Sequence, residues 1–110
     1  MMDHQLFHLD ALAAEQDAAG RRYLEFLRTD TMSGGVYTLA AGAEDPQLPH
    51  REDELYVVLA GAGVLRVGEA ELPVRAGSVA FVAAQAVHRF HDITEDLRVL
   101  VLFAPAESDG

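Results

Sequence analysis

The sequence contains no cysteine, and its basic residues are all arginine because lysine is absent as well. Without thiols the chain cannot form a disulfide framework, a thiolate zinc site, an iron–sulfur cluster or a cysteine nucleophile. Without lysine, Schiff-base catalysis and a P-loop are both excluded. Any metal ion that this protein binds must therefore be held by nitrogen and oxygen ligands.

Positive charge is scarce and dispersed. Eighteen acidic residues oppose eight arginines, which gives a net charge of -10. Nucleic-acid binding needs a basic patch that releases counterions from phosphates, so we expect no nucleic-acid partner. The start of the chain lacks the charge and apolar run of a signal peptide, and no stretch approaches the roughly 18 apolar residues of a membrane span. We therefore expect a cytoplasmic protein with no membrane partner.

Length and composition indicate one globular domain with one core, since the chain has 110 residues and 50% of them are hydrophobic. The alanine-rich stretch Leu9–Ala19 predicts a short helix, with Asp10 as a candidate N-cap and Gly20 at its end. The expected organisation is a single domain over residues 1–110: an N-terminal segment 1–20, a strand-rich body 21–104, which the family resemblance given below identifies as a β-barrel, and a tail 105–110.

After Gly20 the pattern changes to short runs of β-branched, aromatic and alternating apolar residues, which are typical of strands. Eight strands are predicted: Tyr23–Arg28, Gly35–Ala40, Leu55–Ala60, Val64–Gly68, Glu71–Arg75, Ser78–Val82, Val87–Asp92 and Leu97–Phe103. Turn residues separate these runs, so an all-β antiparallel sandwich or barrel is favoured over alternating βα units. Pro73 lacks an amide donor, so its strand should be an edge strand or be interrupted there.

Histidines are the first candidates for chemistry in a chain without cysteine. His4 and His8 precede the strands and are interpreted as solvated side chains. His50 flanks a predicted strand and His88 lies within one, where an inward imidazole needs a partner or a ligand. If His88 points inward, strand alternation directs His91 outward.

The densest polar cluster, Pro49 to Glu54, runs directly into an apolar strand. In an extended strand His50 and Glu54 share a face but stand on the order of 13 Å apart, too far to chelate one ion. The chain must bend at residues 51–53 if both bind. A helix that begins at Pro49 would also bring them together, but the β-branched run and glycines that follow favour a strand. Geometry leaves Glu52 open as a ligand, because it neighbours His50 on one face of a strand.

The spacing of these residues resembles the first motif of the cupins. The matching stretch runs from Gly42 to Gly61, with Leu48, His50 and Glu54 at the motif positions between them and gaps of five, one, three and six residues. The family has a histidine where this chain has Leu48. The pattern is a glycine, five residues, His-x-His, three or four residues, a glutamate, six residues and a glycine.

The second cupin motif resembles the stretch from Gly77 to Asp92, with His88 at the position of the motif histidine. Ala83 and Gln85 replace the proline and glycine of that motif, and Asp92 replaces its asparagine. The resemblance implies a double-stranded β-helix, which is a jelly-roll-type antiparallel barrel with a short N-terminal helix.

The resemblance also implies a metal centre, with His50, Glu54 and His88 as ligands of one divalent ion, either Fe, Zn, Mn or Ni. Two imidazoles and one carboxylate suit a non-haem iron(II) site or a catalytic zinc with open positions. Further candidate ligands or pocket residues are Glu52, Gln47, Gln85, Tyr56 and Phe90. In the alternative without a metal, His88 hydrogen-bonds to Glu54, or Glu54 pairs with Arg89 or Arg51.

Three functions follow from this site. The first is a metal-dependent enzyme acting on a small organic molecule, with dioxygenase chemistry favoured over isomerase or hydrolase chemistry. The second, suggested by Leu48, is a non-catalytic small-molecule binding or sensor module, and the third is a structural barrel with an inactive site. Acidic residues around the first motif should attract a cation and disfavour highly anionic substrates. We also expect a homodimer, in which Tyr23–Arg28 or Leu97–Phe103 closes an exposed sheet edge.

Overall fold

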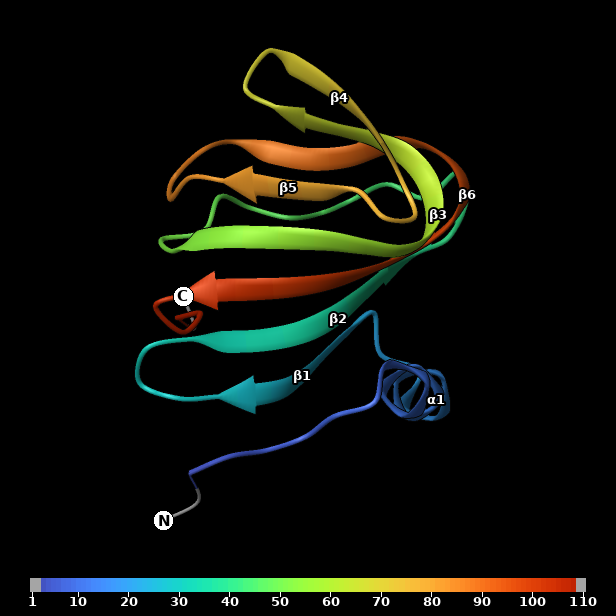
Figure 1. The fold of residues 1–110 in the computed structure, drawn as a ribbon. Coiled ribbons are helices and arrows are strands. Elements are labelled where there is room, and N and C mark those ends of the chain that lie inside the picture. Colours follow the sequence, from blue (N-terminus) through green and yellow to red (C-terminus); the bar gives the residue numbers. More distant parts are fainter. Residues whose placement is uncertain (1–2, 109–110) are drawn as a thin grey trace.

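The computed structural model describes residues 3–108 as one helix and an antiparallel sheet that curls into a barrel (Figure 1). The elements are α1 (Leu9–Ala19), β1 (Tyr23–Arg28), β2 (Ser33–Leu39), β3 (Asp53–Val67), β4 (Ala70–Arg75), β5 (Val79–Val82) and β6 (His88–Ala104). The strand order is β1-β2-β6-β3-β4, and β5 pairs with β3. This architecture is the expected all-β barrel with a short N-terminal helix.

The described chain has six strands rather than the predicted eight, because two pairs of predicted strands are continuous. Leu55–Ala60 and Val64–Gly68 belong to β3, and Val87–Asp92 and Leu97–Phe103 belong to β6, within one residue at the ends. Residues 61–63 in β3 and 93–96 in β6 have the composition of turns, but they continue the pairing of β3 with β6 through a series of register shifts. These shifts bend both strands without ending them.

The bend in β3 and β6 requires glycine at residue 61. Gly61 has a φ of 92°, and a Cβ there would lie 2.1 Å from the carbonyl oxygen of Asp96. Asp92 on the facing strand also has a positive φ, of 47°. Because both strands bend together, the first residues of β6 curl over the first residues of β3. Side chains at the starts of the two strands therefore face the same interior.

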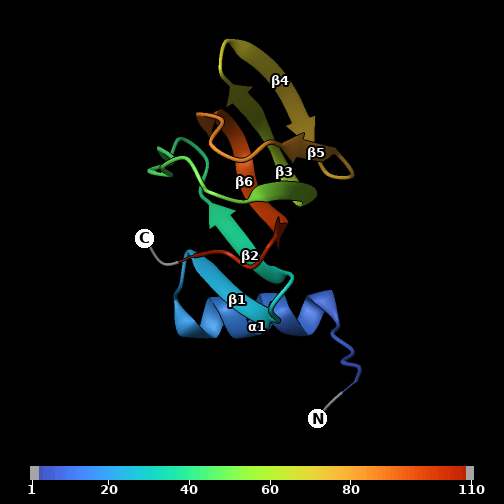
Figure 2. The same ribbon diagram turned by 90° about the vertical axis from the view of Figure 1, so that its left-hand side faces the viewer.

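Helix α1 lies against β1 and β2 (Figure 2). The N-cap position is held by His8, not by the predicted Asp10, which lies in the first turn and accepts a hydrogen bond from Ala11 N–H. Gly20 ends the helix with a φ of 64°, as predicted. Gln16 is buried and its amide donates to the Val36 carbonyl, which ties the helix to the sheet. No helix within residues 3–108 is long and apolar enough to cross a membrane.

The core lies between the curled halves of the sheet and follows the alternation of the strands. In β3, Glu54, Tyr56 and Val58 are buried, whereas Leu55 and Val57 between them are partly exposed. The inner face is therefore apolar except at the first residues of the strand, where Glu54 lies. Strand β4, which carries Pro73, is at the end of the strand order, so the prediction of an edge strand is confirmed.

Candidate metal site

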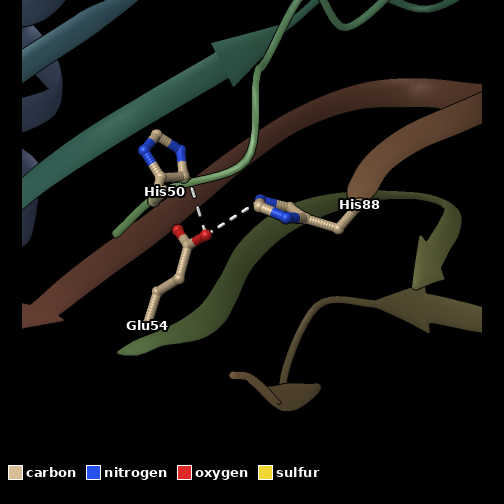
Figure 3. A group of neighbouring side chains, drawn as sticks. All are labelled: His50, Glu54 and His88. Atoms are coloured by element: carbon tan, nitrogen blue, oxygen red, sulfur yellow. Dashed lines mark ion pairs between the residues drawn. The ribbon is translucent and has the colours of Figure 1, made fainter. Parts of the chain in front are cut away.

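Three side chains from separate parts of the sequence meet inside the barrel. His50 comes from the loop before β3, Glu54 from the start of β3 and His88 from the start of β6 (Figure 3). Glu54 Oε1 lies 2.8 Å from His88 Nε2 and 3.9 Å from His50 Nε2. One ligand atom of each residue lies within 4.8 Å of the other two. The structure thus brings together the three residues that the cupin resemblance selects.

The local backbone explains how His50 and Glu54 share one site. The chain bends at residues 51 and 52 and β3 begins at Asp53, so His50 does not extend the strand. The His50 carbonyl accepts a 2.7 Å hydrogen bond from the N–H of Gln85, which holds the loop against the turn before β6. This bend replaces the separation of about 13 Å that a straight strand would impose.

His88 is oriented by its two ring nitrogens. Nδ1 lies 2.8 Å from the Ala86 carbonyl, an acceptor only, so Nδ1–H donates there and Nε2 faces Glu54. Burial of His88 acts against protonation, but its interactions with Glu54 and the Ala86 carbonyl outweigh burial and raise the pKa of the imidazole. Protonated His88 would form a 2.8 Å ion pair with Glu54 Oε1 through Nε2.

Glu54 is a buried carboxylate with few partners. The residue is 2% exposed, and neither carboxylate oxygen has a well-directed hydrogen bond among the described residues, although Oε1 touches His88. No ion pair links Glu54 to Arg51 or Arg89 in the described part of the chain, so that alternative is not observed. An underused carboxylate beside two imidazole nitrogens is a donor set that fits a divalent transition metal.

Gln47 and Tyr56 complete the polar surroundings of the group. Gln47 Oε1 lies 3.2 Å from His50 Nε2 and accepts a hydrogen bond of 3.2 Å from the Tyr56 hydroxyl, whose oxygen is 3.1 Å from His88 Nε2. The Gln47 amide nitrogen donates to Asp45, which fixes the direction of the amide. Burial and the charge of Glu54 raise the pKa of Tyr56 well above its usual value, so the phenol stays protonated.

The other predicted candidates lie around the group rather than in it. Glu52 is buried, but its carboxylate accepts hydrogen bonds from Ser108, so it faces the C-terminal tail. Gln85 is exposed and contributes its main-chain N–H alone. Phe90 is buried and packs edge-on against Tyr56, with ring centroids 5.0 Å apart. His91 points outward and pairs with Glu71, as strand alternation predicts.

Leu48 stands where the cupin motif has its first histidine, and its side chain is 77% exposed. It therefore offers nothing to the site. The nearby Gln47 is the residue whose side chain reaches the group, through the contact with His50. The site thus has three strong ligand candidates and one neutral amide oxygen beside them.

A cavity of about 190 Å³ adjoins the His50 side of the group. It is lined by Tyr23, Tyr37, Gln47, His50, Val101, Phe103 and Glu107. The Tyr23 hydroxyl is buried and has no hydrogen-bond partner among residues 3–108. At roughly 30 Å³ per water, the space suits about six waters or a small organic molecule. No cationic arginine is among these lining residues.

Two residues of this surrounding, Asp45 and Glu107, were not among the site candidates named from the sequence. Asp45 accepts hydrogen bonds from the Tyr37 hydroxyl, Gln47 and the N–H of Phe90. Glu107 lies 3.3 Å from His50 Nδ1, and burial raises its pKa while His50 acts in the opposite direction. The two-residue spacing of Asp45 and Gln47 was a usable turn signal, but nothing in the tail composition indicated Glu107.

The fold and the site define a small antiparallel β-barrel with a histidine–glutamate–histidine group in its interior. Residues 35–103 match the sequence pattern of the cupin domain family, so the chain belongs to that family. An uncharacterized protein of Streptomyces coelicolor is 50% identical over 102 residues, covering 93% of this chain and 97% of the relative.

Solved structures share the fold. The chain is similar to TT1209 from Thermus thermophilus, with a TM-score of 0.74 and 25% identity over 94% of this chain and 99% of the other. It also resembles KdgF from a Halomonas species, with a TM-score of 0.69 and 18% identity over 76% of each chain.

Proposed function

We propose that this protein binds one divalent metal ion, Fe, Zn, Mn or Ni, through His50, Glu54 and His88, and that the bound ion acts on a small organic molecule. The observation that carries the proposal is the buried Glu54 carboxylate, which lacks well-directed hydrogen bonds among the described residues yet lies next to two imidazoles. When bound, iron in such a site supplies dioxygen chemistry, and zinc, manganese or nickel supplies Lewis-acid polarisation of a carbonyl or water.

The cavity beside His50 supports a ligand that is small and not strongly anionic. The lining carboxylate of Glu107, together with the nearby Glu54, gives this space a negative potential with no arginine in its wall. The Tyr23 hydroxyl offers a free donor, which favours a ligand with a carbonyl or hydroxyl oxygen. Tyr37 and Gln47 are held by Asp45, so this wall is already ordered.

The polar neighbours have separate tasks in this proposal. The Tyr56 hydroxyl stays protonated and donates to Gln47 or to a ligand that reaches the site. The Ala86 carbonyl holds Nδ1–H of His88, so Nε2 is the nitrogen that faces the ligand-binding point. Phe90 packs edge-on against the Tyr56 ring and holds its position.

The test is a metal titration followed by thermal unfolding, with Fe²⁺, Zn²⁺, Mn²⁺ and Ni²⁺ tested separately. A metal at a hundred times its Kd stabilises the wild type by about 2.7 kcal/mol. His88→Ala should abolish this response. His91→Ala, which removes an outward histidine of the same strand, is the matched control and should keep it. A response that His88→Ala leaves intact would place the metal elsewhere, and no response in the wild type would refute the proposal.

A second function is a non-catalytic binding module, and the outward Leu48 supports it because one family ligand is missing from the site. A screen of phenols, keto acids and sugars separates the two functions. Thermal stabilisation without product favours the module, whereas product formation that depends on His88 favours the enzyme.

We also propose that the chain forms a homodimer. Strand β6 lies between β2 and β3, so it has no free edge and cannot close one, whereas β1 is at the end of the strand order. Val79 and Phe81 of β5 are 63% and 62% exposed on the outer face, and clustered apolar groups of this kind mark contact surfaces. The cytoplasmic location and the absence of nucleic-acid and membrane partners stay predictions.

A further inference from the structure

We propose that Glu107, from the C-terminal tail, is a positioning residue that selects the tautomer of His50 needed for metal binding. Glu107 Oε2 lies 3.3 Å from His50 Nδ1, an ion-pair distance, whereas the other ring nitrogen, Nε2, is the one that faces Glu54. A carboxylate on the outer nitrogen of a metal-ligating histidine fixes the ring and raises its basicity. Glu107 itself is not in the three-residue group.

The tail that carries Glu107 is docked to the barrel at several points. The Glu107 carbonyl accepts a 2.8 Å hydrogen bond from Arg28, and its N–H donates to the buried hydroxyl of Ser33. The N–H and hydroxyl of Ser108 both donate to Glu52 Oε2. The buried Glu52 therefore anchors the tail, and the anchored backbone holds the Glu107 side chain over His50.

The two histidines of the site differ in which ring nitrogen has a neutral hydrogen-bond acceptor. In His88 the Ala86 carbonyl accepts Nδ1–H, which leaves Nε2 facing Glu54. In His50 the competing acceptor is Gln47 Oε1, 3.2 Å from Nε2, which favours the proton on the wrong nitrogen for a ligand. An ionised carboxylate is a stronger acceptor than an amide oxygen, so Glu107 draws the proton to Nδ1.

This preference is measurable in the metal-free protein by long-range ¹H–¹⁵N correlation of the imidazole nitrogens at about pH 8.5, above the usual histidine pKa. In the wild type we expect His50 to carry its proton on Nδ1. Glu107→Ala should move the proton to Nε2, and Glu107→Gln should give an intermediate distribution. An unchanged tautomer in Glu107→Ala would overturn the proposal.

Two control variants separate the carboxylate from the tail and from general charge. Ser108→Ala removes one tail anchor but keeps Glu107, and Glu95→Gln removes one exposed negative charge elsewhere on β6. Both should leave the tautomer of His50 as in the wild type. If Ser108→Ala shifts it as much as Glu107→Ala, tail docking is the cause and the assignment of the carboxylate fails.

The consequence for metal binding rests on the proposed function. Loss of such a partner lowers metal affinity about 10- to 100-fold, so Glu107→Ala should raise the Kd of the tightest metal by at least tenfold, with Glu95→Gln unchanged. An equal Kd for Glu107→Ala and wild type would contradict the positioning role. If the wild type binds no metal, the proposed function fails while the tautomer measurement still decides the role of Glu107.

Discussion

Replacing Glu54 by glutamine should change the stability of the metal-free protein in opposite directions at low and high pH. Glu54 is buried, and the ionisable group nearest to it among the described residues is His88, whose Nε2 lies 2.8 Å from Glu54 Oε1. The pKa of His88 is raised in the folded protein despite its burial. The stability from this pair is therefore fully present below the unfolded histidine pKa of about 6.5 and is lost as the pH rises through the folded pKa.

The magnitudes follow from the contacts. At about pH 5 the variant loses the buried 2.8 Å ion-pair contact between Glu54 and protonated His88, so it should be less stable by about 1.5–3 kcal/mol, the range for an interaction with a charged group. At a pH above the folded pKa of His88 the imidazole is neutral and the wild type holds an unpaired buried carboxylate, so the neutral amide should be more stable by about 1 kcal/mol. Each kcal/mol corresponds to about 4–8 °C in Tm for a domain near this size.

The assay is urea and thermal unfolding of both proteins in EDTA across this pH range. Glu71→Gln is the matched control, because Glu71 pairs with His91 at the surface and an exposed pair contributes about 0–1 kcal/mol. A Glu54→Gln variant that is equally destabilised at both ends of the range would refute the reasoning, since Glu54 would then act as a structural group independent of the charge on His88.

Three further predictions test other parts of the account. Gly61→Ala should destabilise the fold by more than about 2 kcal/mol in urea unfolding, because of the positive φ and the contact with the Asp96 carbonyl; a change below about 0.5 kcal/mol would show that the bend does not need glycine. Phe81→Glu should convert the proposed dimer to a monomer in light scattering with an unchanged Tm, and a monomeric wild type would contradict the dimer. Tyr56→Phe should cost about 1 kcal/mol of stability and weaken binding of an oxygen-bearing ligand, whereas unaltered binding would remove its hydroxyl from the site.

Strand content and the inner face were predictable from the sequence because burial follows local alternation. Tyr56 and Val58 point inward, and Gly20 ends the helix as its conformational freedom suggests. The continuity of β3 and β6 was not predictable, since residues with turn composition can stay paired when the facing strand bends with them. That pairing depends on Gly61 approaching the backbone of Asp96, a contact between distant residues.

Part of the candidate site was also predictable from the sequence and part was not. Spacing alone left Glu52 and Glu54 as alternatives, and the family resemblance favoured Glu54, the one that the structure places beside His88. The tail contribution of Glu107 was beyond local reasoning, because contacts with Arg28, Ser33 and Glu52, all distant in the sequence, dock the tail that brings its side chain to His50. A composition typical of a frayed terminus carries no information about such docking.

The measurement that most directly tests the central claim is the metal content of the native protein. The protein would be purified without chelators and analysed for Fe, Zn, Mn and Ni per chain, alongside His88→Ala and the control His91→Ala. We expect close to one ion per chain in the wild type and in His91→Ala, and almost none in His88→Ala. Metal-free wild-type protein that also fails to bind any of the four ions on reconstitution would contradict it.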